Sequence, residues 1–369
     1  DERLDVVGIG SMVVDRVHRT PRILGADAKG ILRPVEGVDP VRTAVGGVVL
    51  NHLGWAAALG LRTGIFGRQA ADENGRFLRA AMDRAGMARA ITLDGAASSF
   101  AEIFVDDHGD RAIYMAPGAT SDTTADHVRA HAGFVARAAR LTTEVSQLPL
   151  PAAREALRLA AEQGIPTVVD LDVPPSDAIA SGLGDAATLD AVLCAADLLK
   201  PSKSAARELV PDAGGDALAM ARALRARFEA DVVLTDGESG CAVAAADFEG
   251  FVPTRRVKAV DTTGAGDAFL GGLLVALQRG LGWEHAAGLA NACGAACAEQ
   301  IGAFPEDAEA ARVRVLGLYA GPDLASTPAA VAEPAEAPEA FAVLDTALEE
   351  LAALRERIGG ASFDASIAL

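Results

Sequence analysis

Asp267 stands in a setting that suggests chemistry. It follows the turn Gly264-Ala265-Gly266 at the start of an almost wholly apolar helix, and the β-branched run before the turn, which ends at Asp261, predicts a strand. Glycines let the first N–H groups of a helix turn toward a ligand, and the helix dipole favours an anion there. A carboxylate at this place would repel phosphate unless it has a chemical task. We therefore predict that Asp267 is a general base and that Gly264, Ala265 and Gly266 form an anion hole.

A helix N-cap is the alternative role for Asp267, because aspartate is favoured at that position. A cap alone would not require a Gly-Ala-Gly turn in front of it. The turn therefore favours the catalytic role.

The elements that must position this turn alternate between strands and helices. The hydrophobic pattern predicts strands at 5–10, 62–67, 139–144, 166–170, 198–199 and 231–235, and helices at 49–59, 73–85, 124–138, 151–163, 185–195, 203–209, 216–228 and 284–300. Such an alternation indicates an α/β fold of three layers, α/β/α, with a mostly parallel sheet. Because ligands bind at the carboxyl ends of parallel strands, we expect the turns after Asp170, Thr235 and Asp261 to share one cleft.

Two β-rich segments interrupt the alternation. The first covers about residues 12–45 and is rich in Pro, Gly and charged residues, and the second covers about 97–117. In the second segment, residues 100–105 and 111–114 flank the turn 106–110, as in a hairpin. We predict that both segments leave the main sheet and build a small β lid.

Composition limits the class of protein. The chain has 369 residues, of which 50% are hydrophobic, and its net charge is −18. The excess of acidic residues and the lack of Lys/Arg clusters argue against nucleic acid as a partner. No apolar run approaches the ~20 residues of a membrane span, so no membrane association is expected. The four cysteines lack CxxC spacing, which is typical of free thiols in a reducing, cytoplasmic environment.

The C-terminal part differs in composition from the rest. Residues 1–320 fit one large domain, whereas residues 321–369 are rich in Pro, Ala and Glu. Residues 322–369 hold nine acidic and two basic residues, a net charge of −7. We predict an acidic linker followed by a helix at about 338–358, which either packs on the body or pairs with a second chain.

Four motifs together resemble the ribokinase-like (PfkB) carbohydrate kinases. They are Gly46-Gly47-x-x-x-Asn51, the segment 67–75, the turn 235–240 (Thr-Asp-Gly-Glu-Ser-Gly) and Asp261-Thr-Thr-Gly-Ala-Gly-Asp267, in the family's order over about residues 4–315. The resemblance implies a ribokinase-like fold with a β lid and ATP-dependent phosphorylation of a hydroxyl on a sugar or similar small molecule. It implies Mg²⁺ as a cofactor, a monovalent cation as a further candidate, and a homodimer as a candidate assembly.

The resemblance also implies roles for single residues. The substrate-binding positions are matched by Asp15, Gly46, Gly47 and Asn51, and the nucleotide-binding positions by Thr235, Gly237, Gly240, Ser202 and Asn291. Structural roles stay open as alternatives: a lid turn for Asp15, an early helix position for Asn51 and a buried helix-pair hydrogen bond for Asn291. Arg111 could reach a substrate from the lid, but a solvated hairpin position is the more ordinary expectation.

Two departures from the family pattern bear on metal and substrate. The family's Asn-x-x-Glu reads Ser202 to Ala205 here, so the metal-ordering glutamate is missing and the metal ligands stay unassigned; Glu208 and Asp172 are acidic alternatives. Val48 replaces the lysine of ribokinases, and 170–175 lacks the arginine of ketodeoxygluconate kinases. Neither of those substrates is favoured. A catalytically weak relative that serves as a nucleotide or sugar sensor or partner module, and a nucleoside kinase, remain alternatives.

Overall fold

The structure, a computed structural model, describes residues 2–34, 39–108 and 110–321. The predicted acidic linker and C-terminal helix lie outside these residues. Among the described residues, no helix has the length and apolar character that crossing a membrane requires.

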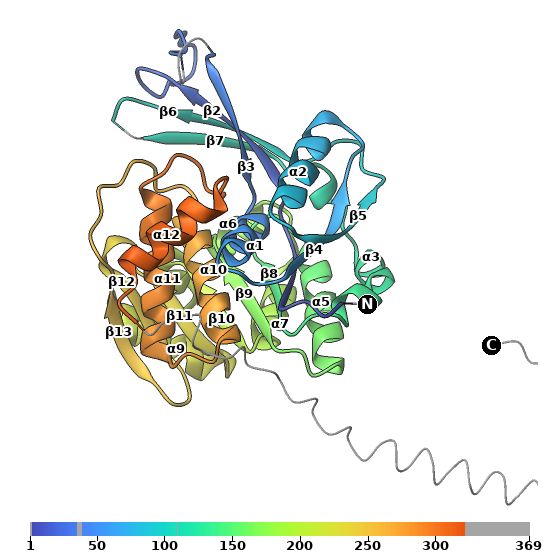
Figure 1. Cartoon of the computed structure of the whole chain (residues 1–369), viewed down its shortest axis with the longest axis vertical. Helices are drawn as coiled ribbons and strands as arrows, with labels where there is room; N and C mark the ends of the chain where they lie inside the picture. Colours follow the sequence, from blue (N-terminus) through green and yellow to red (C-terminus); the bar gives the residue numbers. More distant parts are fainter. Residues whose placement is uncertain (1, 35–38, 109, 322–369) are drawn as a thin grey trace, which may run out of the picture. The chain divides into compact units, whose positions relative to one another are not determined.

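The core is a nine-stranded sheet with the order β13-β12-β11-β10-β9-β8-β1-β4-β5 (Figure 1). Its strands are β1 (Val6–Ile9), β4 (Thr63–Gln69), β5 (Ala88–Leu93), β8 (Leu141–Glu144), β9 (Thr167–Leu171), β10 (Leu198–Pro201), β11 (Asp231–Thr235), β12 (Gly240–Ala244) and β13 (Glu249–Pro253). Neighbouring strands from β5 to β11 are parallel, whereas β12 is antiparallel to both β11 and β13. The predicted mostly parallel sheet is therefore confirmed.

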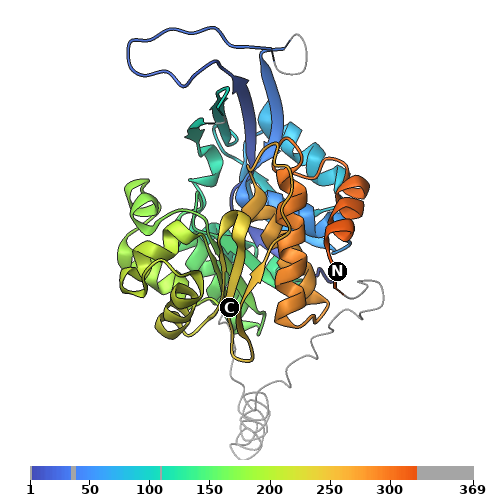
Figure 2. The same ribbon diagram turned by 90° about the vertical axis from the view of Figure 1, so that its left-hand side faces the viewer.

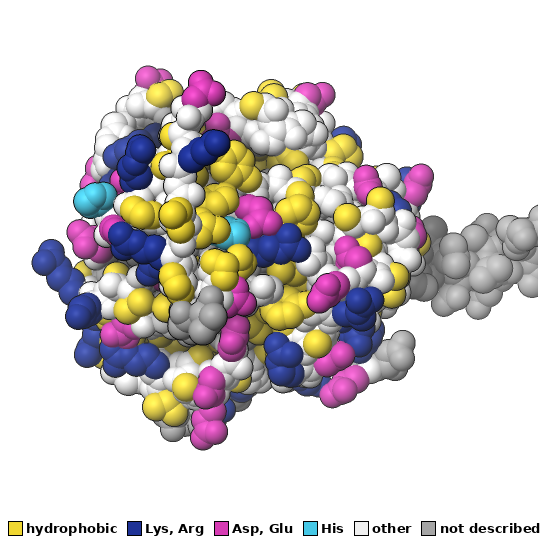
Figure 3. Space-filling view, turned by 90° about the horizontal axis from the view of Figure 1, so that it is seen from above, with side chains coloured by type: hydrophobic (Ala, Val, Ile, Leu, Met, Phe, Trp, Pro, Cys, Tyr) yellow, Lys and Arg dark blue, Asp and Glu magenta, His cyan; other side chains and the backbone are white. Residues whose placement is uncertain are grey.

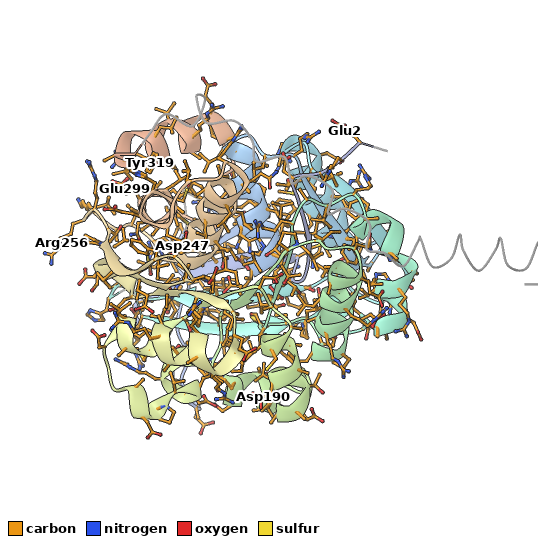
Figure 4. All side chains as sticks on the ribbon, turned by 90° about the horizontal axis from the view of Figure 1, so that it is seen from below. Glu2, Asp190, Asp247, Arg256, Glu299 and Tyr319 are labelled. Carbon is orange, nitrogen blue, oxygen red and sulfur yellow. The ribbon has the colours of Figure 1, made fainter. Side chains whose placement is uncertain are left out.

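Helices cover both faces of this sheet, and side chains fill the space between the layers (Figures 2 and 4). One face carries α1 (Val48–Ala58), α2 (Glu73–Arg84), α10 (Ala265–Gln278), α11 (Trp283–Ala298) and α12 (Ala308–Leu318). The other carries α3 (Ala125–Ala130), α4 (Ala132–Val135), α5 (Leu150–Glu162), α6 (Pro175–Ala180), α7 (Ala186–Cys194), α8 (Lys203–Leu209) and α9 (Ala217–Phe228). The three-layer prediction is confirmed.

Small residues let α10 pack closely against its neighbours. A Cβ at Gly272 would stand 2.5 Å from the Cys293 sulfur of α11, and one at Gly271 would stand 2.6 Å from the Trp55 Cβ of α1. The predicted close packing of α10 on α11 is therefore confirmed. This packing fixes the position of α10, which follows the turn 264–266.

The predicted lid is a separate four-stranded sheet with the order β3-β2-β6-β7. Its strands are β2 (Val13–Arg19), β3 (Val41–Gly46), β6 (Phe100–Val105) and β7 (Arg111–Ala116). The face of the lid that carries Asp15 also carries Arg111, which bonds across to Thr263. On the side of the molecule seen in Figure 3, basic, acidic and hydrophobic side chains are intermixed.

Several local predictions were wrong. The segment 257–261 is no strand, because the backbone N–H groups of Val260 and Asp261 both donate to Ala298 O at the end of α11, at 2.7 and 3.2 Å. The helix predicted at 124–138 breaks at His131, whose ring stacks on Phe66. Five helices and strands of the described residues were not predicted: β5, α6, α12, and the two strands of the β12–β13 hairpin.

Candidate active site

Helix α10 starts at the cleft with free N–H donors. Its N-cap is Gly264, with φ 75°, and no side chain caps it. The helix thus starts at Ala265, two residues before Asp267, so the predicted start at Asp267 was wrong and the N-cap alternative for that residue is excluded. Six other helices, α2, α3, α7, α8, α9 and α12, start at an Asp, Ser or Thr whose side chain accepts a backbone hydrogen bond. The turn before α10 leaves this place open for a ligand.

Fewer backbone donors face the cleft than the motif suggests. The N–H of Thr263 donates to Asp261 Oδ1 at 2.9 Å, and that of Ala265 to Thr262 O at 3.3 Å. Among the described residues, the N–H groups of Gly266 and Asp267 have no acceptor. Of the predicted anion hole, Ala265 is therefore partly used within the turn, whereas the N–H groups of Gly264 and Gly266 have no acceptor among the described residues.

Asp267 is buried against helix α1. Its Oδ2 accepts a 2.7 Å hydrogen bond from Asn51 Nδ2, so the structure joins the predicted base to a predicted substrate residue. Burial raises the pKa of Asp267 well above its ordinary value, and the nearby carboxylates Asp172 and Asp170 raise it further. Lys200 and the bond from Asn51 act in the opposite direction. A carboxyl poised in this way can take up a proton during a reaction.

The loop after α11 packs against the turn 264–266. A Cβ at Gly264 would stand 2.2 Å from the Ala303 Cβ, and Trp55 Nε1 donates to Ala303 O at 2.8 Å. Gly302 N donates to Asp261 Oδ2 at 3.1 Å. The other side of this loop lines a cavity of about 620 Å³, which none of the predicted site residues line.

The Gly46-Gly47 turn brings the lid to the start of α1. A Cβ at Gly46 would stand 2.2 Å from Asp15 Oδ2, and one at Gly47, with φ 100°, would stand 2.6 Å from Ser11 O. Asp15 lies in lid strand β2, where burial and the nearby Asp261 raise its pKa to about 7. Both glycines are thus required by close approach, and Asp15 lies near enough to Asp261 for their charges to interact.

Glu144 is a residue of this region that sequence reasoning missed. Its side chain is fully buried at the end of β8 and accepts hydrogen bonds from Ser11 N at 2.9 Å and Ser11 Oγ at 2.7 Å. Ser11 Oγ in turn accepts the N–H of Val48 at 2.8 Å, so Glu144 holds the start of α1. Burial raises the pKa of Glu144 to about 7. Its position at the carboxyl end of a predicted buried strand was the available signal.

A buried ion pair lies close to the turn 264–266, and sequence reasoning missed it as well. Lys200 Nζ donates to both carboxylate oxygens of Asp170, at 2.9 and 3.0 Å, and both side chains are almost fully buried. They stand side by side at the carboxyl ends of β10 and β9. The end of β9 thus lies near Asp267 at the start of α10.

The predicted nucleotide residues lie near one another. Ser202 caps α8 and forms a β-bridge with Thr235, and the turn with Gly237 and Gly240 follows directly, so these four lie together. Asn291 donates at 3.0 Å to Val252 O in β13, the carbonyl that lies against Gly240. This strand bond, rather than the helix-pair bond considered from the sequence, is its structural contact.

No magnesium cage is preformed in the described residues. They contain no cluster of three or more His, Cys, Asp or Glu side chains suited to a metal. Ala205, at the place of the family's glutamate, is fully buried. Glu208 accepts from Ser176 N and Oγ at 2.7 and 2.8 Å, so its carboxylate is already occupied.

Arg111, in the lid, contacts Thr263, the residue before the turn 264–266. Its guanidinium donates to the Thr263 hydroxyl, across the cleft from strand β7. Arg111 is exposed on the β6–β7 hairpin, as expected, and it has this contact in addition. The contact places a positive charge over the turn where the anion hole is predicted.

Comparisons with known proteins agree with this fold. The pfkB family carbohydrate kinase profile matches residues 3–309. Fructokinase-1 of Oryza sativa subsp. japonica is 29% identical over 315 residues, which cover 81% of this chain and 93% of that protein. The probable fructokinase-5 of Arabidopsis thaliana is 47% identical over 81 residues, only 20% of this chain and 25% of that protein. The solved structure of Arabidopsis thaliana ribokinase complexed with ribose and ATP has a TM-score of 0.68 at 19% identity, covering 87% of this chain and all of that one.

Proposed function

We propose that this chain, which belongs to the pfkB family of carbohydrate kinases, transfers the γ-phosphoryl group of ATP to a hydroxyl of a sugar or a similar small molecule. The observation that carries the proposal is the position of Asp267. Its carboxylate is buried, bonded to Asn51 and located at the uncapped start of α10. A base and a set of anion-binding donors thus meet at one point.

In the proposed reaction, Asp267 takes the proton from the substrate hydroxyl as the hydroxyl oxygen attacks the γ-phosphorus. A new O–P bond forms while the bond to the leaving ADP oxygen breaks, and the bonding pair goes to ADP. The open N–H groups of Gly266 and Asp267 would bind the oxygens of the transferred group. Asp15 and Asn51, with the turn Gly46-Gly47, would hold the acceptor.

Nucleotide binding is proposed for the group formed by Ser202, Thr235, Gly237 and Gly240, with Asn291 nearby in α11. Because the described residues offer no cage, a magnesium ion would be held mainly by the phosphates and water, as is usual for this ion. When bound, it would neutralise phosphate charge. A monovalent cation stays a prediction without an assigned site.

A homodimer is the proposed assembly. Edge strand β7 of the lid exposes the large apolar side chains Ile113, Tyr114 and Met115. Burial between two lids would remove this apolar surface from water. Sedimentation measurements on the unaltered protein and on Tyr114→Lys would test it, and a monomer in both cases would refute it.

The test of the function is a panel of sugars, polyols, sugar acids and nucleosides, with ADP release measured by a coupled assay. We expect turnover on at least one sugar-like acceptor. Asp267→Asn should lower the rate about 10²- to 10⁴-fold, because a positioned general base is lost while the bond to Asn51 can be kept. Asp216→Asn, the same change at the exposed cap of α9, is the matched control. If both variants match the unaltered enzyme, the role of Asp267 is refuted.

A weak or inactive relative that binds nucleotide or sugar as a sensor or partner module is the second candidate. Ala205 favours it, because a fully buried alanine stands where the family has its metal-ordering glutamate. Calorimetry that shows binding of Mg·ATP, together with no ADP release on any acceptor, would favour this candidate over the kinase. Turnover on nucleosides alone would indicate a nucleoside kinase.

A further inference from the structure

Lys200 is a fully buried cation whose position the proposed reaction does not yet explain. Burial of an ammonium group is costly unless the group is paired, and Asp170 pairs with it through two bonds, of 2.9 and 3.0 Å. An ammonium group has three N–H donors. No acceptor for the third is found in the described part of the chain.

The ammonium group lies directly behind the catalytic turn. A Cβ at Gly266 would stand 3.2 Å from Lys200 Nζ, so glycine at this position leaves room for the lysine as well as for a ligand. Lys200 is also close enough to act electrostatically on Asp267, although these two side chains form no ion pair. The lysine is thus near the base but bonded to another carboxylate.

The surroundings of Asp267 make this arrangement important. Asn51 of α1 donates to it, Asp170 and Asp172 face it from the end of β9, and Lys200 faces it from β10. The Cys297 thiol of α11 lies near both Asp267 and Asp261. Among the described residues that act on Asp267, Lys200 is the cation.

From this geometry we propose that Lys200 and Asp170 are a pair of positioning residues: the charge of Lys200 favours loss of the proton from Asp267, and Asp170 keeps Lys200 from bonding Asp267 directly. The inference rests on the proposed role of Asp267 as a base. Without Lys200, a buried carboxyl beside two other carboxylates would hold its proton and could not accept another. Without Asp170, the lysine would be free to pair with Asp267 and would make it a weaker base.

The two partners should therefore shift the titration of Asp267 in opposite directions. In Lys200→Met, the loss of a nearby positive charge should raise the pKa of Asp267 by about 1 unit or more. In Asp170→Asn, the loss of a like charge and the release of Lys200 should lower it. An ion pair that does not act electrostatically on Asp267 would produce no such opposite shifts.

The titration is best measured directly, by carbon NMR of aspartate carboxyl groups labelled with ¹³C. The signal of Asp267 is assigned by its absence in Asp267→Asn. This measurement needs no substrate, so it stays informative if the protein proves to have no kinase activity. If it has activity, the acid limb of the pH–rate profile should move with the measured titration, upward in Lys200→Met and downward in Asp170→Asn.

The double variant Asp170→Asn/Lys200→Met is the control for misfolding of the single variants. It removes both buried charges together, so neither is left unpaired. It should fold, as judged by circular dichroism and thermal melting, and its titration midpoint should fall between those of the single variants. Shifts of the two folded single variants in the same direction, or no shift in either, would overturn the proposal. Absence of turnover with opposite shifts intact would instead refute only the kinase function.

Discussion

Glu144→Gln tests the role of the buried Glu144 carboxyl, which holds the start of α1 through Ser11. Glu144 is fully buried, and burial raises its pKa from 4.5 to about 7. The substitution removes the ionisable group but keeps an oxygen that can accept the bond from Ser11 N. Its effect on stability should therefore depend on pH.

The sign follows from proton binding. Between the unfolded pKa of 4.5 and the folded pKa of about 7, the folded protein holds a proton on Glu144 that the unfolded chain has released. The free energy of unfolding must then fall as the pH rises through this window. From about pH 5 to about pH 8 the loss is about 2 to 3 kcal/mol for this one group. Glu144→Gln escapes this loss, so its stability relative to the unaltered protein should rise by that amount.

Urea unfolding at several pH values from about 5 to about 8 measures the difference. Glu155→Gln is a control of opposite sign. Bonds from Arg158 and Arg129 lower the pKa of Glu155 to about 2, so its ionised form stabilises the fold over this whole window. That control should be less stable than the unaltered protein by an amount that hardly changes with pH. A difference between Glu144→Gln and the unaltered protein that stays constant from about pH 5 to about pH 8 would refute the reasoning.

Two further predictions concern the catalytic turn. Gly264→Ala should lower both the melting temperature and the activity, because φ is 75° and the new Cβ would meet the Ala303 Cβ at 2.2 Å. The control is Gly60→Ala, where φ is 97° but the space around the new Cβ is open. It should lower stability through backbone strain alone, by about 1 kcal/mol, and leave the activity unchanged. Equal losses in both variants would speak against the role of the Ala303 contact. Arg111→Met should weaken binding of Mg·ATP or slow turnover by about 10-fold or more if the guanidinium over Thr263 meets the phosphates, as measured by calorimetry and steady-state kinetics. Unchanged values for both quantities would assign Arg111 to the lid surface alone.

The sequence predicted the layers of the fold well, because buried parallel strands and amphipathic helices repeat over most of the chain. It failed where tertiary contacts decide. The run 257–261 has the composition of a strand, yet its backbone bonds to the end of α11 at Ala298. The β12–β13 hairpin was missed because the glycine-rich turn at 235–240 was interpreted as part of a loop between a strand and a helix.

The candidate site was predictable to the extent that it lies in one local motif. Asp267 and its turn could be found because glycine and aspartate at fixed spacing have a physical meaning there. Lys200 and Glu144 could not be found in this way, because each acts through residues far away in the sequence. Only the order of strands in the sheet brings Lys200 beside Asp170, and Glu144 beside Ser11.

The uncapped start of α10 links ligand binding to local folding. A helix whose first N–H groups lack acceptors is held less firmly at that end, and an anion that binds there supplies the missing bonds. Amide hydrogens of residues 266 and 267 should therefore exchange with solvent much faster in the free protein than with a bound nucleotide, while those of the capped start of α9 should not change. Slowed exchange at this one turn would then identify ligands even when no phosphoryl group is transferred, and it would report occupancy rather than turnover.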